Sequence, residues 1–277
     1  MEPNVQVHEA HRVARMRRPG LGHQLFEEAV SALGNDDRRD QAPEDIPALV
    51  ERAFEVGATR AAAIPVSQVV VDPRVTMKCM IPPCEVYGTD HMCPPFSPTA
   101  AEFSGYLKAY EHAVLVQVQD RLPEGFEAFV AETEDNWYCS LHRQKTWARE
   151  YGDVMMPLWR RLHLAVLAVE QEARVQGHAG AVGIAGSDCG FCQPDDEAGR
   201  NAVFSLVHPD EPPPTGPFEG CIVAEACPYP ELARPAMEAV GIDVVRTLRN
   251  AGWELRFPAT SYLEEGVAQW TGLVLIA

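Results

Sequence analysis

The apolar and polar residues in the first half of the chain alternate in a way that predicts helices and strands in turn. An amphipathic helix is predicted at Ile46–Val56, and a strand at Val66–Val71, which is rich in β-branched residues. A helix is predicted to begin at Ser97 or at Thr99, ahead of an apolar stripe with helical spacing, and Thr99 with Glu102 fits a capping box. A further strand is predicted at Ala113–Val118.

The second half of the chain continues this alternation. Residues 137–175 have helical apolar spacing, and Ala179–Ala185 is predicted to be a strand of small residues. Asp243 is predicted to cap a short helix at Val244–Asn250. Two strands are predicted after it, at Trp253–Phe257 and at Thr271–Ile276.

Strands and helices in this order favour an α/β or α+β fold. We expect a mixed sheet flanked by helices, with cysteine-rich loops that follow strands. Residues 1–44 are predicted to be a peripheral N-terminal segment, and residues 45–277 to form one cysteine-rich, metal-binding α/β domain. Residues 193–220 are rich in Pro, Asp and Glu and are predicted to be a loop insert in that domain.

Composition narrows the class of protein. The chain has 277 residues, of which 46% are hydrophobic and 23% charged, so it can bury a core without help from metal. Its net charge of −17 argues against nucleic acid and against an anionic membrane surface, because both attract basic patches. No apolar run is long enough to span a membrane. Small molecules and basic proteins stay open as partners.

Seven of the eight cysteines fall into two groups beside prolines and glycines. The first cysteine segment, residues 79–93, contains Cys79, Cys84 and Cys93. The second cysteine segment, residues 189–227, contains Cys189, Cys192, Cys221 and Cys227. Proline directly follows the last cysteine of each segment, an arrangement also found in bacterial ferredoxins, where it stiffens the chain after a ligand.

Thiols grouped in this way indicate either disulfides or metal. No apolar signal segment follows the charged N-terminus, so we expect a cytoplasmic protein, in which metal ligands or redox groups are more common than structural disulfides. The softness of the ligands and the Cys-Pro pairs favour an iron–sulfur cluster, with 4Fe–4S preferred, over zinc. Disulfides rank third.

The spacing does not fix how the thiolates divide between centres. Four cysteines of the second cysteine segment satisfy one four-coordinate centre, whereas the first cysteine segment offers three. Three thiolates would leave one iron open to a small molecule, or would recruit His91, Asp90 or Cys139 as a fourth ligand. The two segments could also meet and share ligands.

Other polar residues carry weaker signals. Cys139 and His142 share a face of a predicted helix, which fits a nucleophile–base pair but more often means a buried cysteine beside a surface histidine. Arg234, Arg246 and Arg249 would suit a carboxylate or phosphate, although such arginines more often pair with local acids.

The cysteine motifs resemble those of a known family. Its first signature is similar to Lys78–Cys84, Tyr87-Gly88 and Cys93–Thr99, and its second is similar to Cys189–Cys192 and Cys227–Asp243. The family is that of the predicted metal-binding proteins with the domain of unknown function 2284. The resemblance implies that the cysteines bind metal, as an iron–sulfur cluster, but it implies no reaction. The acidic insert between Cys192 and Cys221 departs from the family pattern.

These observations lead to one functional hypothesis and two alternatives. The hypothesis is a cytoplasmic iron–sulfur protein with a redox or small-molecule-activating role, of the oxidoreductase or lyase type if it is an enzyme. Its partner would be a small-molecule substrate or a redox protein. The alternatives are a non-catalytic zinc protein that binds a protein partner, and a protein that delivers metal or sulfur to another enzyme.

Overall fold

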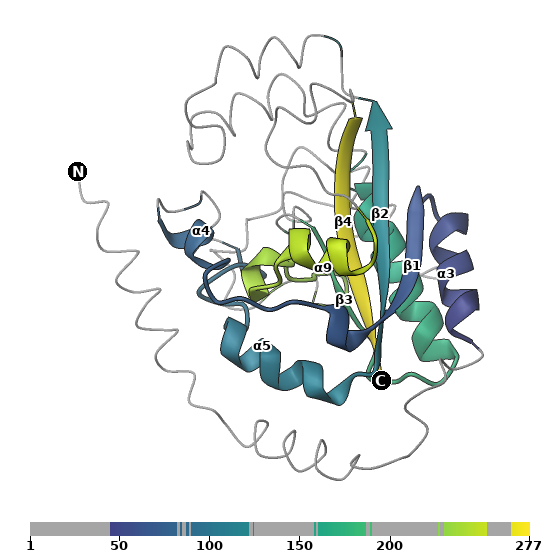
Figure 1. Cartoon of the computed structure of the whole chain (residues 1–277), viewed down its shortest axis with the longest axis horizontal. Coiled ribbons are helices and arrows are strands. Elements are labelled where there is room, and N and C mark those ends of the chain that lie inside the picture. The colour runs from purple at the N-terminus through teal and green to yellow at the C-terminus, as the bar shows by residue number, and fades with distance from the viewer. Residues whose placement is uncertain are drawn as a thin grey trace.

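A four-stranded antiparallel sheet forms the centre of the computed structural model (Figure 1). The strands lie in the order β1-β2-β4-β3, and every pairing between neighbours is antiparallel. Their bounds are Arg60–Pro65 for β1, His112–Arg121 for β2, Val182–Ile184 for β3 and Val267–Ile276 for β4. The structure describes residues 45–81, 84, 87–88, 90–121, 124, 158, 160–186, 189, 227, 230–253 and 267–277.

The period of two along the central strands sends side chains to both faces of the sheet. On β2, Val114 and Val116 pack into one hydrophobic cluster, while Ala113 and Leu115 pack into a second cluster on the other face. Strand β4 behaves in the same way. Because both faces are covered, the central strands have a nearly continuous apolar sequence.

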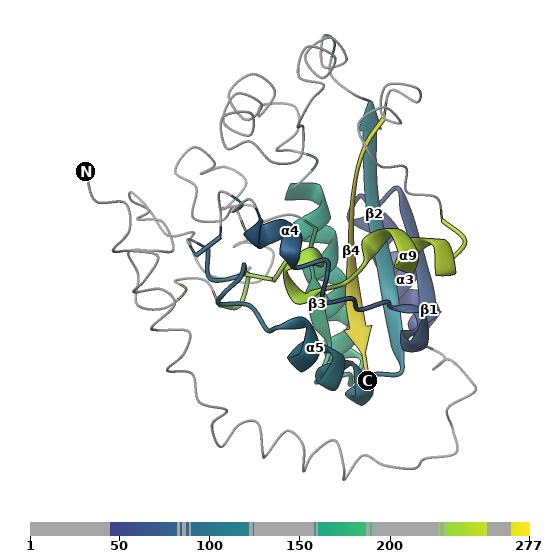
Figure 2. The ribbon, with the colours of Figure 1, turned by 60° about the vertical axis from the view of Figure 1, so that its left-hand side comes forward.

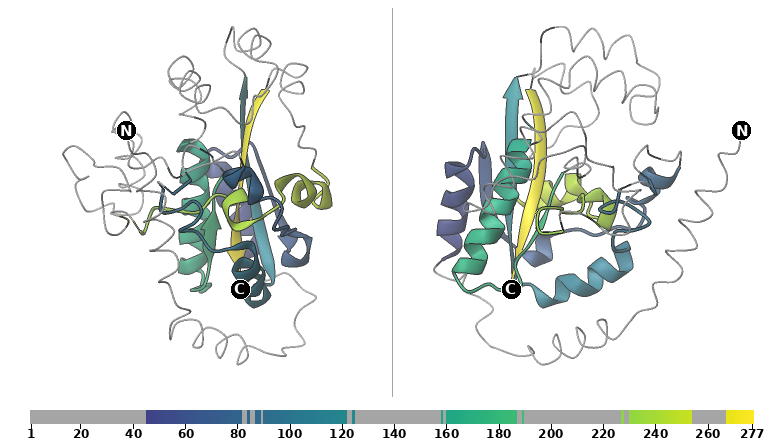
Figure 3. Two further views of the ribbon diagram at one scale, coloured as in Figure 1. Left: turned by 90° about the vertical axis from the view of Figure 1, so that its left-hand side faces the viewer. Right: turned by 180° about the vertical axis from the view of Figure 1, so that it is seen from behind.

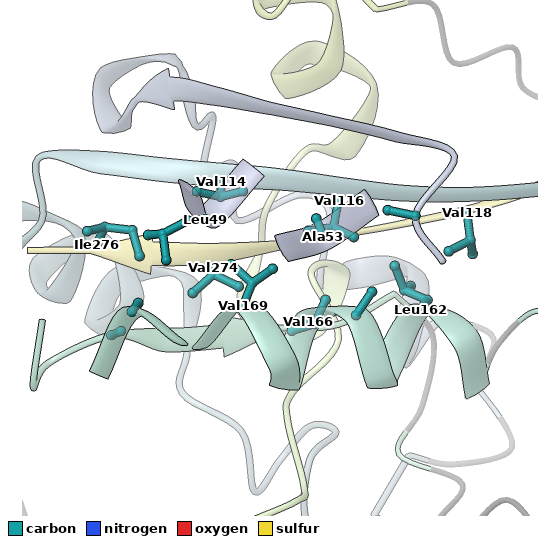
Figure 4. Close-up of a cluster of buried hydrophobic side chains, with 14 of the residues drawn as sticks. Leu49, Ala53, Val114, Val116, Val118, Leu162, Val166, Val169, Val274 and Ile276 are labelled. Carbon is teal, nitrogen blue, oxygen red and sulfur yellow. The ribbon is translucent and has the colours of Figure 1, made fainter. Parts of the chain in front are cut away.

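Two helices cover the first face. They are α3, at Ile46–Glu55, and the helix of residues 160–175 (Figure 3, right). Figure 4 shows Leu49 and Ala53 of α3 with Leu162, Val166 and Val169 of the second helix, all turned toward the sheet. The apolar stripe predicted within residues 137–175 is confirmed for the described helix, and residues 137–157 lie outside the described part.

Shorter elements cover the second face (Figure 2). They are the 3-10 turn Val66–Gln68, the helix α5 at Ala100–Tyr106 with the 3-10 turn Leu107–Ala109, the 3-10 turn Glu238–Val240 and the helix α9 at Val244–Asn250. The short helix α4, at Met77–Met80, has no buried residue and belongs to neither hydrophobic cluster. An antiparallel sheet with helices on both faces is an α+β fold, so this alternative of the predicted fold class is confirmed. The expected mixed sheet is wrong for the described strands, because all three pairings between them are antiparallel.

The side-chain caps predicted at Thr99 and Asp243 are confirmed, whereas Asp45 makes no such cap. Thr99 and Glu102 form the predicted capping box at the start of α5, and the Asp243 side chain accepts a hydrogen bond from the Arg246 amide at the start of α9. Asp45 does not cap α3 with its side chain; its carboxylate instead lies 3.0 Å from Nε2 of His178. The helix at Ile46–Glu55 nevertheless forms as predicted.

One predicted strand is wrong in position. The strand lies at Arg60–Pro65, whereas Val66–Gln68 forms a 3-10 turn and Val71 makes only an isolated bridge to Ile242. The alanines of β1 have a weak intrinsic strand propensity, but all six residues of the strand pair with β2. Pairing with the longer strand β2 therefore outweighs the weak strand propensity of the alanines. Of the strand predicted at Trp253–Phe257, Trp253 is described and belongs to no strand, and residues 254–257 lie outside the described residues.

Gly241 occupies a backbone position that excludes other residues. It ends the 3-10 turn Glu238–Val240 with a φ of +86°, and a Cβ atom there would lie 2.5 Å from Cβ of Ala100. Gly241→Ala is expected to lower the free energy of unfolding by about 2–4 kcal/mol, through left-handed strain and overpacking together. Urea unfolding would measure the loss.

Gly252→Ala is the matched control for this prediction. Gly252 has a φ of +73°, but nothing lies within 4 Å of the position that its Cβ would take. It should therefore show the strain alone, about 1–2 kcal/mol. Equal losses in the two variants would mean that the close packing of Gly241 against α5 contributes nothing.

Candidate metal centre

The first two cysteines of the first cysteine segment lie on and just after α4. Cys79 is within the helix, where its amide donates to the carbonyl of Thr76 over 3.1 Å. The Cys84 amide donates to the Cys79 carbonyl over 3.0 Å, which closes a tight loop between the two residues. Both side chains are half-buried. The expectation that this segment directly follows a strand is wrong, because a helical turn precedes Cys79.

The surroundings of Cys79 hold groups that become negative when they ionise. Burial raises the pKa of Cys79 to about 11, with further contributions from Cys84 and Glu238, and Lys78 lowers it by a smaller amount. Burial also raises the pKa of Glu238, whose pKa Lys78 again lowers. Cys84 and Glu238 therefore both lie within electrostatic range of Cys79.

The third cysteine of this segment is held against the 3-10 turn Glu238–Val240. Cys93 is buried, and its carbonyl accepts hydrogen bonds from the amides of Phe96 and Ser97 over 2.9 and 3.1 Å. The hydroxyl of Ser97 donates to the carbonyl of Ala239 over 3.2 Å. The chain that leaves Cys93, through a cis Pro94–Pro95 bond, is thus fixed to the body of the protein.

The second cysteine segment begins beyond the edge strand β3. Ala185, next to β3, accepts a hydrogen bond from the Met237 amide over 2.8 Å and donates to the Pro235 carbonyl over 2.9 Å. Cys189 follows a few residues later and is 4% exposed. Cys227 is half-buried. In Figures 1 and 2, α4 lies on the β3 side of the sheet, opposite the β1 edge, so the first cysteine segment begins on the side from which the second one leaves the sheet.

A buried carboxylate joins the two cysteine segments. Asp90, 8% exposed, accepts a hydrogen bond from the Met92 amide at Oδ1 over 2.7 Å. Its Oδ2 accepts one from the Cys189 amide over 3.1 Å. The Asp90 carbonyl also accepts from the Cys93 amide over 3.1 Å. One residue therefore contacts the backbones of Cys93 and Cys189, and the two segments meet.

A second buried carboxylate anchors the chain on both sides of the second cysteine segment. Glu170, on the helix of residues 160–175, is 1% exposed. It accepts two hydrogen bonds from Arg234, at 2.5 and 2.6 Å, and one from the Gly183 amide at 2.7 Å. Gly183 belongs to β3 ahead of Cys189, and Arg234 follows Cys227. Arg234 also donates to the carbonyl of Ala233 over 2.8 Å.

His163 belongs to the same buried region. It lies two turns before Glu170 on the helix of residues 160–175, is 2% exposed, and has its pKa lowered to about 3 by burial and by Arg234. The imidazole is therefore neutral at physiological pH. His163, Glu170 and Glu238 were missed by sequence reasoning. The available signal was an acid and a histidine inside a strongly apolar helical stretch, which usually means a paired buried group.

The predicted site residues are only partly described. None of the five described cysteines, Cys79, Cys84, Cys93, Cys189 and Cys227, forms a disulfide. Among the described residues, no three of His, Cys, Asp and Glu form a group that could hold a metal ion. Cys192, Cys221, Cys139 and His142 lie outside the described residues, as does the insert at 193–220. What suits a soft metal is the chemistry of the thiols, together with the contact of the two segments at Asp90.

The other candidate residues contact neighbouring side chains or backbone amides. His91 lies against Phe96, with ring centroids 5.4 Å apart. Both carboxylate oxygens of Asp90, a suggested fourth ligand, accept backbone hydrogen bonds. Arg246 pairs with Asp243 at 4.0 Å and with Asp72 at 3.5 Å, so the local-acid alternative holds for it. Hydrogen bonds from Arg74 lower the pKa of Asp72 to about 2. Arg234 pairs with the distant Glu170.

Comparison with known proteins gives the family. The model of the family described as a predicted metal-binding protein, the domain of unknown function 2284, matches residues 62–276. The chain belongs to this family, and the resemblance seen in the cysteine motifs is confirmed. No curated protein and no solved structure matches the chain significantly. Within the part of the chain that the structure describes, no helix has the length and apolar character needed to cross a membrane.

Proposed function

We propose that this metal-binding protein is a cytoplasmic iron–sulfur protein, with 4Fe–4S clusters as the cofactor. The observation that supports the proposal most is the contact of Asp90 with the backbones of Cys93 and Cys189, which brings the two cysteine segments to one place. Soft thiolates converging from separate loops are the ligands that iron–sulfur clusters take. The five described cysteines form no disulfide, as expected for metal ligands.

The seven cysteines divide between two neighbouring centres in this proposal. Cys189, Cys192, Cys221 and Cys227 would hold one fully ligated centre. Cys79, Cys84 and Cys93 would hold the other, leaving a position open. When bound, such clusters supply one-electron chemistry and, at an open iron, a Lewis acid. The chain's own contribution is to hold the thiolates, exclude water from Cys93 and Cys189, and tune the centre through buried charge.

In this proposal, the activity of the protein comes from the coordination position left open at the three-cysteine centre. It would bind and polarise a small-molecule substrate, and the neighbouring fully ligated centre would exchange electrons with a redox protein. The reaction class that fits this arrangement is that of an iron–sulfur oxidoreductase or lyase. The net charge of −17 suits a basic protein partner.

Anaerobic isolation is the direct test of the cofactor. The purified full chain is expected to be brown, with broad visible absorption and with iron and acid-labile sulfide in equal amounts. A variant in which serine replaces all seven cysteines is the control, and it should be colourless. A colourless native protein with stoichiometric zinc would overturn the iron–sulfur proposal and support a structural zinc protein. Transfer of bound metal to an apo-acceptor would indicate a delivery function instead.

A further inference from the structure

We infer that Asp90 is a positioning residue of the metal centre, which sets the placement of Cys93 relative to Cys189. The inference rests on the proposed metal-binding role of these cysteines and goes beyond it, because it assigns to Asp90 the function of placing two cysteine backbones rather than of ligating metal. It also predicts that replacing Asp90 makes Cys93 and Cys189 more reactive together, although they belong to different segments.

The hydrogen bonds of Asp90 support the inference. Its Oδ1 holds the Met92 amide and its Oδ2 holds the Cys189 amide, a residue 99 positions away in the sequence. Its carbonyl holds the Cys93 amide. Hydrogen bonds from amides to an ionised carboxylate are stronger than those between neutral groups. Asp90 therefore fixes the backbone at one cysteine from each segment.

Burial gives these contacts their importance. Asp90 is 8% exposed, and Cys93 and Cys189 are 4% exposed each. A buried amide that loses its acceptor bears the full cost of its desolvation, so the two segments separate more easily when the carboxylate is lost. Residues that orient metal ligands by hydrogen bonding commonly change metal affinity 10- to 100-fold when they are replaced.

The side chain at this position must be short and must accept two hydrogen bonds. Asparagine has the same size but offers only one acceptor oxygen, so its NH₂ group would face an amide donor, either that of Met92 or that of Cys189. Glutamate keeps the charge and both acceptors but moves them by one methylene group. If position matters, Asp90→Glu should fail as Asp90→Asn does; if only the negative charge matters, glutamate should restore the native behaviour.

Asp72 provides a matched control. Like Asp90 it is a buried aspartate, 9% exposed, and its Oδ1 accepts a hydrogen bond from the amide two residues later, that of Arg74 at 2.9 Å. Its carboxylate otherwise pairs with Arg74 and Arg246 rather than with the backbone of a cysteine. Asp72→Asn thus measures the effect of removing a buried carboxylate that accepts a hydrogen bond from the amide two residues later, without a cysteine being involved.

The experiment measures thiol alkylation and metal content in the full chain. In the metal-free protein, iodoacetamide labelling with peptide mapping is expected to be about tenfold faster or more at both Cys93 and Cys189 in Asp90→Asn and Asp90→Glu, with native rates in Asp72→Asn. After anaerobic isolation, the two Asp90 variants should hold less metal than Asp72→Asn. Far-ultraviolet circular dichroism checks that each variant is folded.

The outcomes distinguish the positioning role of Asp90 from the iron–sulfur proposal. Faster labelling at both cysteines, with native labelling in the control, supports the inference whichever metal is present. Labelling that accelerates at one cysteine alone, or at neither, overturns it, as does restoration by glutamate. A native protein that contains zinc rather than iron and sulfide overturns the iron–sulfur proposal but leaves the role of Asp90 standing, if Asp90→Asn lowers the zinc content.

Discussion

Glu170→Ala is expected to lower the free energy of unfolding by about 3–5 kcal/mol, because it leaves a buried arginine without its carboxylate. The side chain of Glu170 is 2% exposed and that of Arg234 is 11% exposed, so neither charge can recover its hydration in the folded state. The Gly183 amide of β3 would lose its acceptor as well. Urea unfolding of the metal-free protein would measure the loss.

Arg174→Ala is the control on the same carboxylate. Arg174 pairs with Glu170 at 2.5 Å, but its side chain is 49% exposed. A pair with so much solvent contact contributes at most about 1 kcal/mol. A loss under about 1 kcal/mol in Glu170→Ala would contradict the expected importance of the buried pair.

A double variant tests the mechanism behind this prediction. Replacing Glu170 and Arg234 together by leucine and methionine removes both buried charges, and such replacements often recover stability. The pair Glu170→Leu and Arg234→Met should therefore be more stable than Glu170→Ala alone. If the pair serves to place the second cysteine segment, the double variant should still bind less metal than the native chain, since the anchor beyond Cys227 is gone.

The sequence predicted the elements whose signals are local. The capping box at Thr99 and the cap at Asp243 depend on residues three apart, so the helices that follow them were placed correctly. The apolar stripe of residues 160–175 was likewise confirmed because its spacing is a property of the helix alone. Strand β1 was misplaced because its stability comes from pairing with β2, which no local pattern records.

The candidate metal centre also has features that the sequence predicts and features that it does not. The cysteine motifs were visible in the sequence and led to the correct family. The contacts that bring the segments together were not visible, since Asp90 and Glu170 act on residues far away in the chain. The sequence offered Asp90 as a candidate ligand, and the structure adds that its oxygens accept hydrogen bonds from two backbone amides. Whether a carboxylate near a cysteine binds metal or accepts hydrogen bonds depends on the groups that the fold places next to it, and these come from distant parts of the chain.

If the chain holds the two proposed iron–sulfur centres, Cys189→Ser is expected to remove the fully ligated one, about half of the bound iron for two equal clusters, while the fold survives. Serine is a far weaker ligand for a soft metal than a thiolate. The fold should survive because the two hydrophobic clusters are built from the sheet and its covering helices, and Cys189 belongs to neither of them. Iron analysis, visible absorption and circular dichroism of the same sample would measure both effects.

Cys221→Ser and Cys79→Ser complete this test. Cys221→Ser should lose the same share of iron as Cys189→Ser if both ligate one centre, and unchanged iron would remove Cys221 from the ligand set. Cys79→Ser should lose the other share. Because the segments meet at Asp90, the loss of one centre is also expected to alter the spectrum of the other. Two losses that are fully independent would mean that the segments lie side by side without sharing an environment.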